Sequence, residues 1–394
     1  MISKSITDQL AGSSWIHKMF EEGTRLKAIY GEDNVFDFSL GNPDLEPPKE
    51  VVEAFRNIVD HPLPGIHRYM SNAGYDSTRA KVAEMLSAES GEPMDKASVI
   101  MTVGAAGALN VILKTLLDQG DEVLVLAPYF VEYLNYIRNH GGVPVIVPCD
   151  ERTLEPDAER IRKAITPRTK AIIINSPNNP SGVVYSRECL TAIEEMLVQQ
   201  DHVVYVISDE PYKQIVFGET QVPSMLGLFK NVIVCYSWSK ALALPGDRIG
   251  FMAANPECED YQNLMAGAIM SNRSLGFVNA PALMQRVIEK TMQAKVDVAS
   301  YEKRCNLLYD IVTSSGFACN RPQGALYLFP ESPIEDDVAF AAEAAKNNLL
   351  LVPGTGFGMK GRFRLTFCVD EKVIIGSREA FKKTARTFGL KNRE

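Results

Sequence analysis

The sequence predicts an α/β protein whose main domain is a largely parallel sheet flanked by helices. Between about Ser98 and Ala254, short apolar runs rich in β-branched residues recur every few tens of residues, with helix-like segments between them. Strands that alternate with helices in this way are typical of an α/β domain. Most of the runs are apolar throughout, as expected of strands buried on both faces. At 394 residues the chain also exceeds what one hydrophobic core usually organises, so we expect two domains.

Seven of the apolar runs are predicted as strands of the main sheet. They are Ser98 to Val103, Glu122 to Leu126, Pro144 to Pro148, Ala171 to Asn175, Val203 to Ser208, Val232 to Ser237 and Ile249 to Ala254. After Pro281 the pattern predicts one long helix, or two joined helices, ending at Gly316.

This helical segment leads into a smaller α+β domain. Its predicted strands run from Ala325 to Phe329 and from Arg362 to Val369. We place the large domain at residues 48–295 and the small domain at 296–394, and we expect residues 1–47 to pack on the small domain.

Composition narrows the function classes. The formal net charge of −8 disfavours binding to nucleic acid or to an anionic membrane surface, so small molecules are the expected partners. The sequence start has no signal-peptide pattern, and no run of about eighteen apolar residues occurs. The seven cysteines form no CxxC pair, which favours reduced thiols in the cytoplasm. The five histidines show no metal-ligand spacing, and we predict no metal requirement.

Candidate functional residues follow the predicted strands, because ligands of an open α/β sheet bind outside the carboxyl ends of its strands. The strand ending at Val103 is followed by Gly104-Ala105-Ala106-Gly107 and a helix start. Free N–H groups and the helix dipole at such a point suit a phosphate. A tight turn with glycines for close packing explains the same residues equally well.

Three further runs end in polar or reactive side chains. AIIIN ends in Ser176-Pro177-Asn178-Asn179-Pro180-Ser181-Gly182, VVYVIS ends in Asp209-Glu210-Pro211-Tyr212, and VIVCY ends in Ser237-Trp238-Ser239-Lys240, with Arg248 downstream. Taken singly, these are a turn, a solvated acidic strand end and a surface lysine. Taken together, they supply the parts needed to hold pyridoxal 5′-phosphate.

In order and spacing these motifs resemble those of the class I and II aminotransferases, pyridoxal-phosphate enzymes of fold type I in the aspartate aminotransferase superfamily. The resemblance runs from Ser39 to Val369. It implies a large cofactor-binding domain with a mainly parallel seven-stranded sheet, a smaller α+β domain, and a homodimer with its active site at the subunit interface.

The resemblance assigns a role to each cofactor-binding residue. Lys240 resembles the lysine that carries the cofactor as a Schiff base and moves the proton from Cα, and Asp209 resembles the aspartate facing the pyridine nitrogen. Asn179 and Tyr212 resemble the pair that binds the phenolic oxygen. The phosphate site would comprise Ser237, Ser239, Arg248 and the backbone of Ala105 and Ala106, with Tyr69 reaching the phosphate of the neighbouring subunit.

Other matching positions concern the ring face and the substrate. Phe130 resembles the aromatic residue stacked on the cofactor ring, and the adjacent Tyr129 is an alternative. Gly41 and Asn179 resemble residues that approach the substrate carboxylate, and Arg364 resembles the arginine that binds it. Strand alternation places Arg362 on the same face, and the family's Arg-apolar-Ser/Thr pattern favours Arg364.

The implied reaction is ping-pong transamination between an L-amino acid and a 2-oxo acid through pyridoxamine phosphate. The fold also serves C–S β-lyases and non-catalytic regulators that bind the same cofactor, and these remain alternatives. The family favours glutamate and 2-oxoglutarate as one substrate pair. Arg273 lies in a region from which related enzymes project a substrate-binding cation across the dimer interface, although a surface or interface salt bridge is at least as good an explanation.

Overall fold

The computed structural model describes residues 2–11 and 15–391 and contains one large sheet and two small ones. The large sheet has seven strands in the order β2-β8-β7-β6-β5-β3-β4, and only β8 is antiparallel to its neighbours. This confirms the predicted seven-stranded, mainly parallel sheet. The strands are β2 (Val99–Thr102), β3 (Glu122–Ala127), β4 (Val143–Pro148), β5 (Thr169–Asn175), β6 (Tyr205–Asp209), β7 (Val232–Ser237) and β8 (Gly250–Ala254).

Helices cover both faces of this sheet, and the alternation of side chains along each strand divides the interior into two clusters. Leu124 and Leu126 of β3 pack in one buried cluster, whereas Val123 and Val125 pack in another. The first cluster includes side chains of α3 (Lys49–Asp60), α4 (Asp76–Ser90), α7 (Ala158–Ala164), α8 (Arg187–Leu197) and α11 (Ala282–Thr291); the second includes those of α5 (Gly104–Leu116), α6 (Tyr133–Asn139) and α10 (Tyr261–Ser274).

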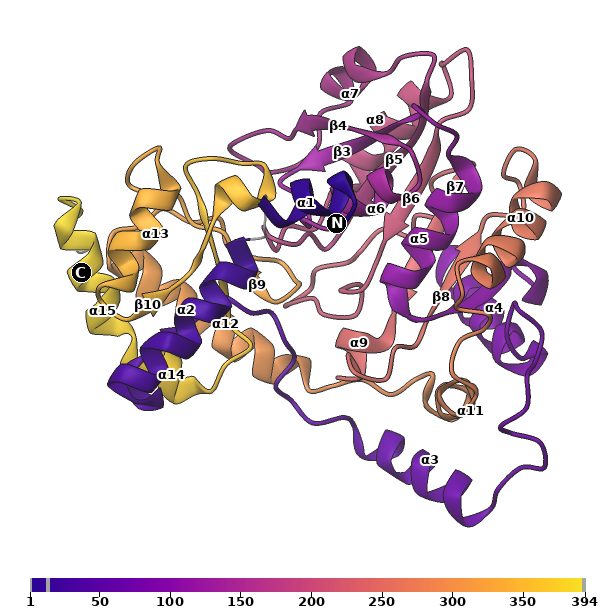
Figure 1. Ribbon diagram of the computed structural model, residues 1–394, viewed down its shortest axis with the longest axis horizontal. Helices are drawn as coiled ribbons and strands as arrows, with labels where there is room; N and C mark the ends of the chain where they lie inside the picture. Colours follow the sequence, from indigo (N-terminus) through magenta and orange to yellow (C-terminus); the bar gives the residue numbers. More distant parts are fainter. Residues whose placement is uncertain (1, 12–14, 392–394) are drawn as a thin grey trace.

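The C-terminal part forms a separate body beside the sheet, seen in orange and yellow in Figure 1. A three-stranded antiparallel sheet has the order β11-β12-β9, and β1 pairs in parallel with β10. These strands are β1 (Phe36–Asp37), β9 (Tyr327–Leu328), β10 (Leu349–Leu350), β11 (Val352–Pro353) and β12 (Phe363–Thr366). Their helices are α12 (Val298–Ser314), α13 (Asp337–Ala345), α14 (Glu371–Gly376) and α15 (Arg378–Thr387).

The N-terminal segment lies against this C-terminal body. It contains α1 (Lys4–Ala11) and α2 (Trp15–Tyr30), and α2 contacts β11. The pairing of β1 with β10 joins the segment to the body by backbone hydrogen bonds, such as that from Phe38 N–H to the Leu350 oxygen at 3.0 Å. The N-terminal segment and the C-terminal body therefore share one small sheet.

The connection between the two bodies consists of two helices, one of the alternatives that the sequence left open. α11 ends at Thr291, and α12 begins after Asp297, whose side chain accepts hydrogen bonds from the N–H groups of Ala299 and Ser300.

The strand predicted from Ala325 to Phe329 is shorter in the structure, where β9 contains only Tyr327 and Leu328. Ala325 has φ 57°, and its N–H donates to the Ile215 oxygen, which lies outside the sheet. Among the described residues, no helix is long and apolar enough to cross a membrane.

Candidate active site

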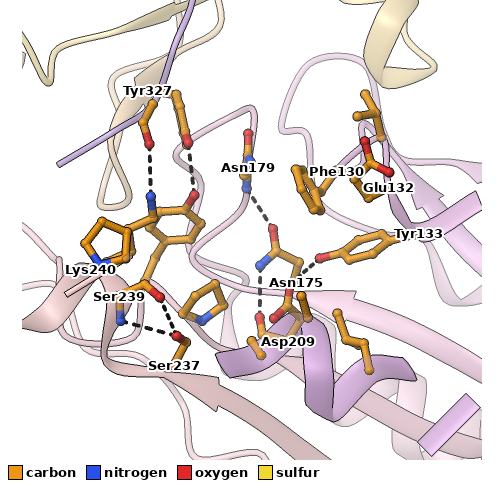
Figure 2. A pocket seen from close by; sticks show the side chains of 18 of the residues that line it. Phe130, Glu132, Tyr133, Asn175, Asn179, Asp209, Ser237, Ser239, Lys240 and Tyr327 are labelled. Carbon is orange, nitrogen blue, oxygen red and sulfur yellow. Dashed lines mark hydrogen bonds between the residues drawn. The ribbon is translucent and has the colours of Figure 1, made fainter. Parts of the chain in front are cut away.

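A cavity of about 610 Å³ lies at the carboxyl ends of β5, β6 and β7 and is closed on one side by the C-terminal body. Asn175, Asp209 and Ser237 line it from the ends of these three strands. Tyr327 of β9 and Arg364 of β12 line it from the small sheet. Of the residues assigned to the cofactor and to the substrate carboxylate, all except Tyr69 line this cavity. Figure 2 shows ten of the lining side chains with labels.

Lys240 lies in the short helix α9 (Trp238–Ala241), which begins directly after β7. The Ser237 hydroxyl caps this helix by accepting a hydrogen bond from Ser239 N–H. The Lys240 Nζ donates to the backbone oxygen of Gly41 at 2.9 Å, and it forms no salt bridge with a carboxylate of the described residues. Burial lowers the pKa of Lys240 to about 8, and the positive charges of Arg364 and Arg248 act in the same direction. The amine is therefore poised to lose its proton near neutral pH.

Asp209 is the last residue of β6 and is buried. Its Oδ2 accepts a hydrogen bond of 2.5 Å from the Tyr133 hydroxyl, whereas its Oδ1 has no hydrogen-bond partner among the described residues. Burial raises the pKa of Asp209 to about 7, against the opposing effect of the Tyr133 hydrogen bond. A buried carboxylate with one free oxygen matches a ligand that carries a cationic N–H group.

The start of α5 and Arg248 form the anion-binding end of the cavity. No side chain caps α5, so the first N–H groups of the helix, next to Ala105 and Ala106, are free to bind an anion. The Arg248 guanidinium is fixed beside them, because Nη1 donates to the Pro245 oxygen at 2.8 Å and Nη2 to the Val103 oxygen at 3.2 Å. The hydroxyls of Ser237 and Ser239, which are 2.6 Å apart, complete this end.

Gly104 is needed for this arrangement. It has φ 79°, and a Cβ atom there would lie 2.8 Å from Arg248 Nη2. A cradle of backbone N–H groups, hydroxyls and one guanidinium has the donor set that suits a phosphate group.

Arg364 is fully enclosed at the opposite end of the cavity. Its Nη1 donates to Asn179 Oδ1 at 3.1 Å and its Nη2 to the Ser39 oxygen at 2.7 Å, whereas its Nε has no hydrogen-bond partner among the described residues. Arg362 does not line the cavity, because its guanidinium binds Glu331 and two backbone oxygens. The structure thus places Arg364, and not Arg362, at the site.

Gly41 and Tyr212 lie in the same region of the cavity. A Cβ atom on Gly41 would overlap the Tyr327 hydroxyl, so this position accepts only glycine without a rearrangement. The hydroxyls of Tyr212 and Tyr327 are 2.9 Å apart. Burial raises the pKa of Tyr212 well above its ordinary value, so its hydroxyl remains a hydrogen-bond donor.

Phe130 lines the cavity and Tyr129 does not. The Tyr129 N–H donates to the Phe357 oxygen at 3.0 Å, and its ring packs against Gly358. The ring of Phe130 meets that of Tyr133 edge to face, with centroids 5.6 Å apart. Of the two aromatic candidates, only Phe130 is placed to touch a ligand in the cavity.

Two predicted residues lie outside the cavity. Tyr69 is 90% exposed, and Arg273 is exposed at the end of α10. Neither side chain lines the pocket formed by its own chain.

Sequence reasoning missed several residues that the fold brings to the cavity, among them Tyr133, Asn175, Tyr327 and Glu132. Asn175 ends β5, so the rule of strand endings was sufficient to find it. Tyr133 follows Phe130 by one helical turn, which gave a weaker signal. Tyr327 lies within a strand of the other body, and no local pattern marks it.

Residues 33–375 of the chain match the family model described as "Aminotransferase class I and II". A probable aspartate/prephenate aminotransferase of Thermus aquaticus is 37% identical over 354 residues, which cover 87% of this chain and 89% of the relative. The aspartate aminotransferase of Geobacillus stearothermophilus is 32% identical over 370 residues, 89% of this chain and 90% of the relative.

Solved structures agree over almost the entire chain. An aminotransferase from Eubacterium rectale matches with a TM-score of 0.96 at 36% identity, covering 99% of this chain and 100% of the other. The aspartate aminotransferase of Thermus thermophilus with maleate matches with a TM-score of 0.86 at 30% identity, covering 98% and 100%.

Proposed function

The chain belongs to the class I and II aminotransferases and is a pyridoxal-phosphate-dependent aminotransferase, and we propose that the cavity described above is its active site, with Lys240 as the cofactor-bearing residue. The observation that carries this proposal is one cavity holding a buried lysine without a carboxylate partner and a buried aspartate with a free oxygen. Neither group has an oppositely charged partner among the described residues. The amine can react with the cofactor's aldehyde, and the free carboxylate oxygen suits its protonated ring nitrogen.

The free groups of the cavity fit pyridoxal phosphate. Asp209 Oδ1 suits the protonated ring nitrogen, Tyr212 and Asn179 suit the phenolic oxygen, and the start of α5 with Arg248 suits the phosphate. When bound, the cofactor supplies an electron-accepting ring that stabilises the negative charge developing at the substrate Cα. Phe130, which lines the cavity, would pack on one face of that ring and orient it.

Lys240 transfers the proton of the reaction. Its Nζ takes the proton from the substrate Cα, which requires an uncharged amine. A pKa of about 8 supports this role, because about a tenth of the amine is then uncharged at pH 7, far more than for an ordinary lysine. The amino acid leaves as a 2-oxo acid, and a second 2-oxo acid accepts the amino group that the enzyme retains.

Arg364 and Asn179 hold the substrate α-carboxylate. The two side chains are joined by a hydrogen bond, and the unpartnered Nε of Arg364 remains available for a carboxylate oxygen. The Gly41 backbone lies on the same side, and its oxygen contacts Lys240. This arrangement fixes Cα close to the lysine amine.

Among the described residues, the cavity has no unassigned cation that could bind the side chain of a substrate. Lys240, Arg248 and Arg364 already have roles, and the wall near Phe130 carries the carboxylate of Glu132. The two relatives described above are named for aspartate/prephenate and for aspartate. A dicarboxylate such as aspartate or glutamate therefore needs another cation, and we assign that role to Arg273 of the partner subunit.

The working unit is a homodimer in the cytoplasm. Tyr69 is 90% exposed and is therefore accessible to a second subunit, to whose phosphate site it would supply a hydroxyl. The seven cysteines are all free, which supports a reducing compartment.

Borohydride trapping and single-turnover chemistry test this proposal. After reduction of the cofactor-loaded protein, we expect the labelled peptide to contain Lys240 and Lys240→Ala to form no adduct. One amino acid added without an acceptor should release one 2-oxo acid per site. Release of ammonia and a thiol instead would indicate a β-lyase.

Arg273→Ala tests the proposed role of Arg273 in substrate specificity. The variant should lower kcat/KM for aspartate and glutamate and spare alanine. Equal loss for all three substrates would contradict the role of Arg273.

A further inference from the structure

Asp209 is held by two residues that have no role in the function proposed above. Asn175 Nδ2 donates to the Asp209 backbone oxygen at 2.9 Å and fixes the main chain. The Tyr133 hydroxyl donates to Asp209 Oδ2 at 2.5 Å and fixes the side chain. Only Oδ1 is left without a partner among the described residues.

Tyr133 is itself rigidly placed. It is buried at the start of α6, its N–H donates to the Phe130 oxygen at 3.2 Å, and its ring lies edge-on to that of Phe130. Figure 2 shows the Tyr133 hydroxyl directed at Asp209. The loop after β3 thus supplies the aromatic ring in the cavity wall, and the first residue of the helix that follows it supplies the hydrogen-bond donor to Asp209.

We propose that Tyr133 is a positioning residue that engages one oxygen of Asp209 and thereby keeps the shared proton on the ring nitrogen of the bound cofactor. This inference rests on the role proposed for Asp209. A neutral donor stabilises the ionised carboxylate relative to the carboxylic acid. Without that donor, a buried aspartate beside a pyridine nitrogen competes for the proton.

The surroundings of Asp209 raise its pKa, which increases its competition with the ring nitrogen for the proton. The carboxylate is buried, and the neighbouring Glu210 adds negative charge; both raise its pKa, whereas Tyr133 lowers it. Glu210 is engaged separately, by the Ser208 hydroxyl and Lys213. Burial raises the pKa of Tyr133 well above its ordinary value, so the hydroxyl stays protonated and donates. No other side chain among the described residues donates a hydrogen bond to Asp209.

The test uses Tyr133→Phe, which keeps the ring and removes only the hydroxyl. The protein is loaded with ¹⁵N-labelled pyridoxal phosphate, and the ¹⁵N resonance of the ring nitrogen is recorded from pH 6 to 9. We expect a protonated nitrogen in the wild type and a shift toward the unprotonated position in the variant. Cofactor affinity and kcat should each fall about tenfold or more, with a smaller change in KM.

Two variants separate the possible outcomes. Tyr236→Phe removes another buried hydroxyl, one without a hydrogen-bond partner among the described residues, and should leave the ¹⁵N resonance unchanged. Asp209→Asn should move the resonance further than Tyr133→Phe does. If Asp209→Asn moves it and Tyr133→Phe does not, the inference about Tyr133 is wrong. If neither moves it, the proposed role of Asp209 fails as well.

Discussion

Arg364 lies in β12, the central strand of the three-stranded sheet, and Arg362 directly precedes that strand, yet their surroundings give them different tasks. We expect Arg364→Lys to raise KM for every amino acid substrate about 10- to 100-fold, because a lysine loses the planar fork and at least one charged hydrogen bond. Cofactor affinity should stay within about twofold. Steady-state kinetics with three amino acids of different side chains measure this effect.

Arg362→Lys is the matched control for this substitution. Arg362 binds Glu331 and the oxygens of Phe329 and Glu151, outside the cavity. The control should lower the midpoint of thermal unfolding and leave KM unchanged. If the two variants had the same effect on KM, the assignment of the carboxylate to Arg364 would be untenable.

Lys240 should control the pH dependence of cofactor loading. Its pKa is lowered to about 8, so the uncharged amine that attacks the cofactor aldehyde accumulates up to that pH and no further. We expect the loading rate of the cofactor-free protein to rise about tenfold per pH unit below 8 and to level off above it. Stopped-flow absorbance measures the rate.

The comparison for this pH profile is a lysine in an unstructured peptide, whose rate should keep rising to about pH 10. Asp209→Asn removes the other group of the cavity that titrates nearby and should leave the bend near pH 8 in place. A bend that disappears in this variant would assign the titration to Asp209.

Most candidate residues could be predicted from the sequence because they lie at the ends of strands or within a few residues after them. Asp209 and Asn179 follow apolar runs that any reader of the sequence would mark. Tyr327 is different, since its position beside Gly41 depends on how the small sheet packs over the large one. No local pattern in the sequence carries that information.

Among the elements, the turn from β2 into α5 is the most sensitive to substitution. Gly104→Ala adds a Cβ atom that meets Arg248 Nη2, whose position is fixed by the Val103 and Pro245 oxygens. We expect cofactor affinity to fall at least about tenfold, since Arg248 must move. Fluorescence titration of the cofactor-free protein gives the affinity.

Gly120→Ala is the control for backbone strain. Gly120 also has a positive φ, of 89°, but a Cβ atom there meets nothing within 4 Å. Both variants should lose about 1–2 kcal/mol of stability from the left-handed backbone, and only Gly104→Ala should lose cofactor affinity. Equal losses of affinity would mean that strain, and not Arg248, is responsible.

The two sheets differ in how well the pattern of apolar residues predicts their strands. The strands of the large sheet were predicted to within a few residues, because most of them are buried on both faces and therefore read as continuous apolar runs. The strands of the small sheet are only two to four residues long. Ala325, with its positive φ, shortens one of them in a way that composition does not reveal.

At the scale of the whole molecule, the roles proposed for Tyr69 and Arg273 require a second subunit, because neither residue lines the cavity of its own chain. The family could be predicted from the sequence because its motifs span both bodies, and the match over residues 33–375 confirms it. The domain boundaries at 47 and 295 remain predictions. The homodimer also remains a prediction. It would give Tyr69 a site in which to act, because Tyr69 does not line the cavity of its own chain.

Mixing two inactive variants tests whether Tyr69 acts across a dimer interface. In a hybrid of Lys240→Ala and Tyr69→Ala subunits, one site would carry both defects and the other would carry neither. Unfolding and refolding an equal mixture should therefore restore about a quarter of wild-type activity at limiting cofactor, because half of the dimers are hybrids with one intact site. Each variant refolded alone is the control and should stay low. If Tyr69 served its own subunit, every hybrid site would carry one defect, and no activity would return.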